Sequence, residues 1–198
     1  MRTVFSAADV SGNRMYALLT ASVVPRPIAW VSTRAADGTA NLAPYSFFTV
    51  ASVSPAVVQF TSVTRKDSLR NIEETGEFVV NLASAPLIER VNASSAVFPP
   101  DVDELAAVGL TAEPSATVAP PRVAESPVAI ECGLYRVVEV GNSFVVMGEV
   151  RAVAVRPDCL AEDGLPEFAA IAPLSRLGRT EWGLPPEVRE LPRPGRPE

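Results

Sequence analysis

The segment 62–76 carries residues that could bind an anion, because a lone lysine precedes an expected helix. Lys66 is the only lysine in the chain, whereas the other sixteen basic residues are arginines. Asp67 or Ser68 is a good N-cap, and Gly76 is a natural C-terminal stop. Free N–H groups of the first turn, the positive end of the helix dipole and the lysine ammonium together fit a phosphate. The alternative is an ordinary capped surface helix.

Arg26 is a second candidate for anion binding, since it stands between two prolines just before an expected strand over residues 28–33. Pro25 and Pro27 fix the backbone on both sides of the arginine, so little freedom is lost when its guanidinium meets an anion. The alternative is an exposed arginine at the start of the strand.

A third candidate segment covers residues 41–48 and reads NLAPYSFF. Pro44 interrupts an otherwise strand-like run and removes a ladder hydrogen bond, which can mark a bulge or a backbone that binds a ligand. Asn41 and Ser46 add polar side chains, and the aromatic residues add flat apolar area. The alternative is an aromatic core with a bulge.

Composition excludes several kinds of chemistry. The chain has no histidine, so Ser-His-Asp and Cys-His catalysis, HExxH zinc sites and most transition-metal sites are excluded. Cys132 and Cys159 suggest neither a disulfide framework nor a CxxC site. A net charge of −6 disfavours nonspecific binding to nucleic acid or to an anionic membrane. No dinucleotide-binding glycine motif and no phosphate-binding Walker motif is present.

The elements that must position these residues are mainly strands. Phe144, Val146 and Gly148 alternate with polar positions, which fits a barrel wall, and Glu131 in an apolar strand needs a partner such as an arginine. The pattern predicts an antiparallel barrel with helical inserts. The expected elements are helices within 6–20, 67–75, 86–93 and after Asp101 or Asp103, strands over 28–33, 57–62 and 77–83, a surface connection over 111–127, and a hairpin over 128–140 and 143–155 turned at Gly141-Asn142.

Domain organisation and location follow from the same patterns. We expect one domain over residues 1–184 and a proline-rich tail over residues 185–198. No apolar run is long enough to span a bilayer, and the N-terminus lacks the apolar region of a secretory signal. We therefore expect a cytoplasmic protein.

Seven short motifs, in order, resemble the flavoredoxin-like branch of the flavin reductase family, whose members are FMN-binding split-barrel proteins. The resemblance covers residues 22–182, and its motifs are PRPIAWVST, DGTANLAPYSFF, KDSLRNIEETGEFVVN, GLT, VAESPVAIEC, GEV and LSRLGR. It implies a mainly β fold, a Greek-key split β-barrel with short helical inserts, and a homodimer with FMN near the subunit interface. Residues 1–184 would then be one FMN-binding split-barrel domain.

The resemblance also implies which residues bind the cofactor. The flavin ring would contact Asn41, Leu42, Ala43, Pro44 and Ser46. The phosphate and ribityl chain would contact Ser62, Arg65, Lys66 and Ser68, with Asp67 as the helix cap. Arg26, Ser32 and Arg176 fall in matched segments and are carried over as further contacts.

Three departures from the family pattern bear on activity. Ser68 replaces the usual threonine but keeps its hydroxyl. Arg179 and Trp182 stand where relatives tend to have glycine and tyrosine. Many relatives also have a histidine near the position of Ala154, which this chain lacks.

The resemblance implies an oxidoreductase that uses NADH or NADPH to reduce flavin or a small substrate by hydride transfer through bound FMN. A partner oxygenase or an electron donor is a further expectation. The alternatives are a noncatalytic FMN electron-transfer protein that serves a partner, and a flavin-free barrel that acts as an interaction domain.

Overall fold

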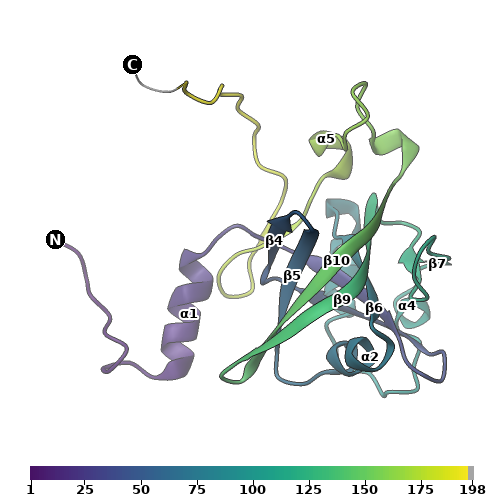
Figure 1. The fold of residues 1–198 in the computed structure, drawn as a ribbon. Helices are drawn as coiled ribbons and strands as arrows, with labels where there is room; N and C mark the ends of the chain where they lie inside the picture. Colours follow the sequence, from purple (N-terminus) through teal and green to yellow (C-terminus); the bar gives the residue numbers. More distant parts are fainter. Residues whose placement is uncertain (196–198) are drawn as a thin grey trace.

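The computed structural model describes residues 1–195 of the 198-residue chain. Its centre is a seven-stranded antiparallel sheet in the order β3-β2-β6-β9-β10-β5-β4 (Figure 1). The strands are β2 (Ala29–Arg34), β3 (Ala40–Tyr45), β4 (Phe48–Val53), β5 (Ala56–Val63), β6 (Glu77–Leu82), β9 (Val128–Val140) and β10 (Ser143–Val155).

The sheet curls into a split barrel because its two edge strands follow each other in the chain. Only Ser46 and Phe47 separate β3 from β4, although these strands lie at opposite edges of the sheet. The N–H of Thr61 donates to the Phe47 carbonyl at 2.9 Å and fixes this corner. The mainly β split-barrel prediction is therefore confirmed.

Short elements surround the barrel. A small sheet in the order β1-β11-β12 places Arg26 directly opposite Arg176. The remaining elements are α1 (Gly12–Ser22), β1 (Arg26–Pro27), α2 (Asp67–Thr75), η1 (Ala85–Leu87), α3 (Ile88–Ala93), α4 (Glu104–Ala107), β7 (Ala112–Glu113), β8 (Arg122–Val123), η2 (Pro157–Cys159), α5 (Phe168–Ile171), β11 (Ser175–Arg176) and β12 (Trp182–Gly183).

Strand β2 separates two apolar cores because its side chains alternate between the two faces of the sheet. Ala29 and Val31 join the core that also contains Phe60 and Phe78, whereas Trp30 joins a second core with Leu105 and other residues of the helical inserts. Thr33 lies on the same face of β2 as the first core, and Ser32 lies on the same face as the second core. These neighbouring polar residues therefore reach opposite sides of the sheet.

The long hairpin has the predicted bounds, with Gly141 in the left-handed region at φ 60°. Gly148 on β10 faces the first core, where a Cβ atom would lie 2.8 Å from the Cβ of Cys132 and would strike the Phe78 ring. We therefore expect Gly148→Ala to lower the free energy of unfolding by about 1–3 kcal/mol, because the core has no room for a methyl group.

Chemical denaturation checks this prediction, with Gly12→Ala in α1 as the control. A Cβ atom at Gly12 would meet nothing within 4 Å. Equal stability of the two variants would contradict the close packing inferred at Gly148.

The predicted surface connection over residues 111–127 is exposed over most of residues 111–119 but is buried at Pro120, Pro121 and Val123. It contains β7 and β8, and its backbone N–H groups at Ala116 and Thr117 donate to the buried Glu131 carboxylate at 2.9 and 2.7 Å. Arg122 lies 3.6 Å from the same carboxylate, which confirms the predicted arginine partner. Burial alone would raise the pKa of Glu131, but hydrogen bonds from Thr117 and Ala116 outweigh this effect and lower that pKa.

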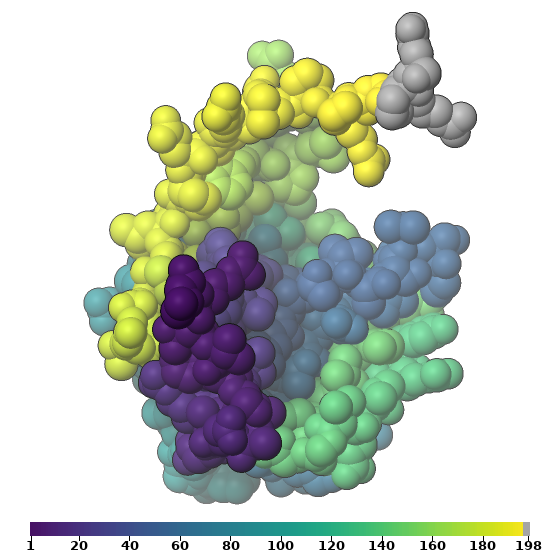
Figure 2. Space-filling model, turned by 90° about the vertical axis from the view of Figure 1, so that its left-hand side faces the viewer, coloured from purple at the N-terminus to yellow at the C-terminus, as the bar shows by residue number. Residues whose placement is uncertain are grey.

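The two ends of the described chain extend from the same side of the barrel (Figures 1 and 2). Helix α1 lies largely within the predicted range and follows the N-cap Ser11, whose hydroxyl accepts from the N–H of Arg14 at 3.3 Å, but it has no buried residue. Residues 185–195 form neither helix nor strand, and the predicted tail boundary stays a prediction. Within residues 1–195, no helix is long and apolar enough to cross a membrane.

Candidate functional site

The N-cap of helix α2 lies one residue before the earlier of the two predicted caps, and no side chain caps the helix. Its N-cap is Lys66, with φ −113° and ψ 172°, so the expected cap at Asp67 or Ser68 is wrong. Asp67 instead pairs with Arg70 at 2.5 Å, and the Ser68 hydroxyl donates to Asn41 at 2.7 Å. The first-turn N–H groups therefore lack a side-chain acceptor and are suited to an anionic ligand. The predicted stop at Gly76 is confirmed, with φ 73°.

The turn from β5 into α2 is held in an uncommon conformation that places Lys66. Thr64 has φ 68°, which is rare for a β-branched residue. Its N–H donates to the carbonyl of Asn142 at the hairpin turn, and its own carbonyl accepts from the Ser62 hydroxyl at 3.0 Å. Ser62 thus shapes the turn that carries Lys66.

A buried polar cluster joins α2 to strands β2 and β3. The Asn41 amide oxygen accepts from Ser68 and also from the Thr33 hydroxyl at 3.3 Å, and Asn71 donates to Thr33 at 3.0 Å. Asn41 and Ser68 were predicted from separate segments, and the fold brings them together. Thr33 and Asn71 were missed, because each is unremarkable in sequence and gains its role only from this contact.

Tyr45 places a buried phenol next to this cluster. Its hydroxyl has no hydrogen-bond partner within the described residues, although buried polar groups are normally paired. Burial raises the pKa of Tyr45, and the neighbouring Ser68 and Ser62 hydroxyls oppose this rise. The Lys66 ammonium lies 5.9 Å from the centre of the Tyr45 ring. An unpaired phenol whose ring lies near an ammonium suits an anionic oxygen as a partner.

The two basic residues at the start of α2 differ in their environment. Arg65 is held in a two-pronged ion pair with Glu73, at 2.5 and 3.1 Å, and lies 4.9 Å from the centre of the Phe144 ring. Lys66 is exposed and makes no ion pair with any residue from 1 to 195. The available charge at this site is therefore that of Lys66, and the predicted contact of Arg65 with a phosphate stays a prediction.

Residues 41–45 lie in edge strand β3, where a proline is tolerated. Pro44 stays in register opposite Trp30, so the predicted break in the ladder is wrong. The N–H of Leu42 donates to the Glu104 carboxylate at 2.7 Å. Ala43 and Pro44 are half-buried, and Ser46 stands at the corner between β3 and β4, where Arg176 lines the same cavity.

Ser32 and Arg26 lie apart from Lys66 and from the buried polar cluster. Ser32 faces the second core, where its hydroxyl donates to the Pro121 carbonyl at 2.5 Å. Arg26 is only 7% exposed, so its interpretation as an exposed arginine is wrong. Its guanidinium donates to the carbonyls of Thr20, Val23 and Leu177, and so it ties the end of α1 to the loop after β11.

Glu104 is a buried carboxyl whose burial and partner the local sequence does not indicate. It lies 7% exposed on α4, and burial raises its pKa to about 7, while the Leu42 N–H opposes the rise and Asp67 and Asp103 add to it. The folded chain therefore holds the Glu104 proton between about pH 4.5 and 7, whereas the unfolded chain releases it. The free energy of unfolding therefore falls as pH rises from about 4.5 to 7, because the buried Glu104 carboxyl must lose its proton, and this loss stays constant above pH 7.

We expect Glu104→Gln to raise the free energy of unfolding at pH 8 by about 1–3 kcal/mol, because a neutral amide can still accept from Leu42 without the cost of a buried charge. The gain should vanish at pH 4. Urea denaturation at both pH values checks this, and an equal effect at both would show that Glu104 does not titrate in this window.

The fold is a split barrel in which the uncapped start of α2 and the exposed Lys66 lie close to Tyr45 at the end of edge strand β3. The chain belongs to the flavin reductase-like family: the family model described as "Flavin reductase like domain" matches residues 21–169. The family prediction is thereby confirmed.

Individual relatives agree with this assignment. An uncharacterized protein of Aquifex aeolicus is 38% identical over 88% of this chain and 91% of its own length. Nitrilotriacetate monooxygenase component B of Bacillus cereus has a TM-score of 0.93 at 28% identity, with 96% of this chain and 99% of that chain covered. The 2-nitrobenzoate 2-nitroreductase of Pseudomonas fluorescens has a TM-score of 0.90 at 31% identity, with 97% of this chain and 96% of that chain covered.

Proposed function

We propose that this chain binds FMN and uses NADH or NADPH to reduce a flavin or a small substrate by hydride transfer. The observation that carries the proposal is the uncapped start of α2, where Lys66 lacks an ion pair within the described residues and lies 5.9 Å from the centre of the Tyr45 ring, whose buried hydroxyl has no partner there. A phosphate fits these groups, because it supplies the acceptor that the first-turn N–H groups lack and the negative charge that Lys66 lacks.

The residues of the site divide by task. Lys66, Ser62, Ser68 and the first turn of α2 would hold the phosphate end of FMN. The strand segment 41–46 would hold the ring, with Asn41 fixed through Ser68 and Leu42 fixed through Glu104. In this division these two hydrogen bonds, one between side chains and one from a backbone N–H to a carboxylate, set the shape of the site before any ligand enters.

Bound FMN supplies the hydride-accepting and hydride-donating chemistry. The chain has no histidine, so its residues position and orient the reactants rather than relay protons through an imidazole. Backbone N–H groups at the corner formed by Ser46 and Phe47 would stabilise negative charge that develops on the ring.

The names of two relatives suggest where the electrons go once the flavin is reduced. One relative is a monooxygenase component B and the other a 2-nitroreductase. By analogy, we propose either a partner oxygenase that receives reduced flavin or a small substrate reduced directly. The missing histidine favours one alternative: an FMN protein that receives electrons from a protein donor and reacts slowly with nicotinamides.

We also propose that the chain forms a homodimer. The face of the barrel around β4 and β9 exposes large apolar residues, since Val50 is 66% exposed, Val53 90% and Tyr135 51%. Exposed apolar area of this kind is typical of subunit interfaces. Sedimentation equilibrium should give twice the chain mass of 21.0 kDa, and a single-chain mass would contradict this proposal.

Anaerobic stopped-flow mixing of the FMN-loaded protein with NADH and with NADPH tests the enzymatic proposal. We expect the flavin absorption band to bleach in a single fast phase with at least one of the two. Bleaching with neither, but with a reduced protein donor, would replace the enzyme by the electron-transfer alternative.

A further inference from the structure

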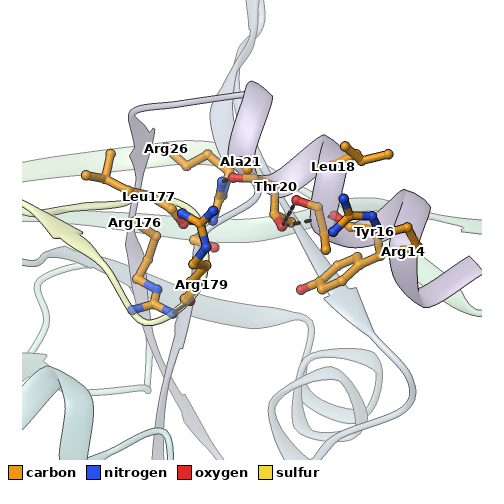
Figure 3. A pocket seen from close by; sticks show the side chains of 11 residues that line it. Arg14, Tyr16, Leu18, Thr20, Ala21, Arg26, Arg176, Leu177 and Arg179 are labelled. Atoms are coloured by element: carbon orange, nitrogen blue, oxygen red, sulfur yellow. Dashed lines mark hydrogen bonds between the residues drawn. The ribbon is translucent and has the colours of Figure 1, made fainter. Parts of the chain in front are cut away.

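A second concentration of positive charge lies away from Lys66, in a cavity of about 350 Å³ between α1 and the loop after β11 (Figure 3). Four arginines line it, and no aspartate or glutamate of the described residues does, although the chain carries a net charge of −6. Arg26, Arg176 and Arg179 lie on one side, and Arg14 lies on the α1 side with Tyr16 (Figure 3).

Two of these arginines are fixed in place without an acidic partner among residues 1–195. Arg26 is held by three carbonyls, and its buried Nε has no hydrogen-bond partner within the described residues. Arg176 stacks on Trp182 at 4.6 Å and donates to the Arg179 carbonyl at 3.2 Å. Burial lowers the pKa of Arg26, the neighbouring Tyr16 opposes this, and Arg176 adds to it. Like charges held together in this way favour an anionic ligand.

The other two arginines are free to adjust to a ligand. Arg14 is exposed on α1, and Arg179 is exposed with only a surface ion pair to Glu181 at 3.4 Å. Surface pairs of this kind contribute little, so a ligand can displace Glu181 at small cost.

The position of the cavity links it to the proposed flavin site. Ser46 and Arg176 line both this cavity and a neighbouring one that also contains Pro44. A molecule in the arginine cavity would therefore reach the end of the segment 41–46. Lys66 lines neither cavity, so the single phosphate of an FMN held at Lys66 leaves the arginine charges unused.

We propose that the arginine cavity binds the phosphate groups of the reduced nicotinamide dinucleotide. This inference rests on the proposed function, since it assigns the site of the electron donor in that reaction. The volume lies within the range of small-molecule sites. Planar guanidinium groups match phosphate oxygens in paired hydrogen bonds, and a dinucleotide carries two or three phosphates to meet several arginines.

The test uses ligands that cannot transfer hydride, so that it does not depend on catalysis. Calorimetric titrations of the FMN-loaded protein with inorganic pyrophosphate and with NADP⁺ would compare the native chain with the double variant Arg14→Gln/Arg179→Asn. Asparagine suits position 179, where φ is 55°. The matched control is Arg2→Gln/Arg136→Gln, which removes two charges from exposed positions outside the cavity.

We expect the double variant to bind both ligands at least about tenfold more weakly, with FMN affinity unchanged and with little change in the control. Equal affinity of the native chain and the double variant for these ligands would overturn the assignment. So would the failure of the native chain to bind either ligand. Loss of FMN affinity alone would assign the cavity to the flavin phosphate instead. In a third titration, with succinate, tighter binding than that of pyrophosphate would assign the cavity to a carboxylate substrate. Binding as expected without any flavin bleaching would contradict the proposed function but not the site.

Discussion

Replacement of Lys66 by alanine is expected to weaken FMN binding by about 1.5–3 kcal/mol, or roughly ten- to a hundredfold. Lys66 stands at the uncapped start of α2 and has no ion pair within the described residues, so its ammonium is available to a phosphate. Titration of the apoprotein with FMN, followed by quenching of flavin fluorescence, measures the effect.

Two further variants show whether the loss is specific. Arg136→Ala removes an exposed charge on β9 and should leave the affinity unchanged. Lys66→Arg keeps the charge and should recover part of the binding. Unchanged affinity in Lys66→Ala would place the phosphate elsewhere, and the arginine cavity would then be the next candidate.

The largest loss of stability is expected for Phe60→Ala, at about 3–5 kcal/mol of unfolding free energy. Phe60 is 1% exposed, and its ring centre lies 4.6 Å from that of Tyr45 and 5.6 Å from that of Phe78. The change would open a cavity directly beside Tyr45, so FMN affinity should fall as well.

Denaturant unfolding of the apoprotein measures this effect without the contribution of a ligand. Phe5→Ala is the control, because Phe5 is 44% exposed near the N-terminus and its removal should cost little. A similar small loss in both variants would contradict the packing that supports Tyr45.

Features with local signals could be predicted closely from the sequence. The hairpin over residues 128–155 combines strict alternation with a glycine-asparagine turn, and its observed bounds equal the predicted ones. Gly76 marks the end of α2, because the left-handed conformation there suits glycine.

Features that depend on contacts between distant segments could not be predicted. The N-cap of α2 differs from the predicted one because Asp67 has a competing partner in Arg70 and Ser68 has one in Asn41. Nothing near Glu104 in the sequence indicates that it accepts from Leu42. Local patterns therefore predicted the elements and the chemical types of the site, whereas the partners of each polar group needed the fold.

Binding of FMN at the start of α2 is the central claim, and titration of the purified chain with FMN tests it most directly. We expect flavin fluorescence to be quenched to a plateau at one FMN per chain, with a weaker curve for Lys66→Ala. A colourless protein that leaves the fluorescence of added FMN unchanged would contradict the claim.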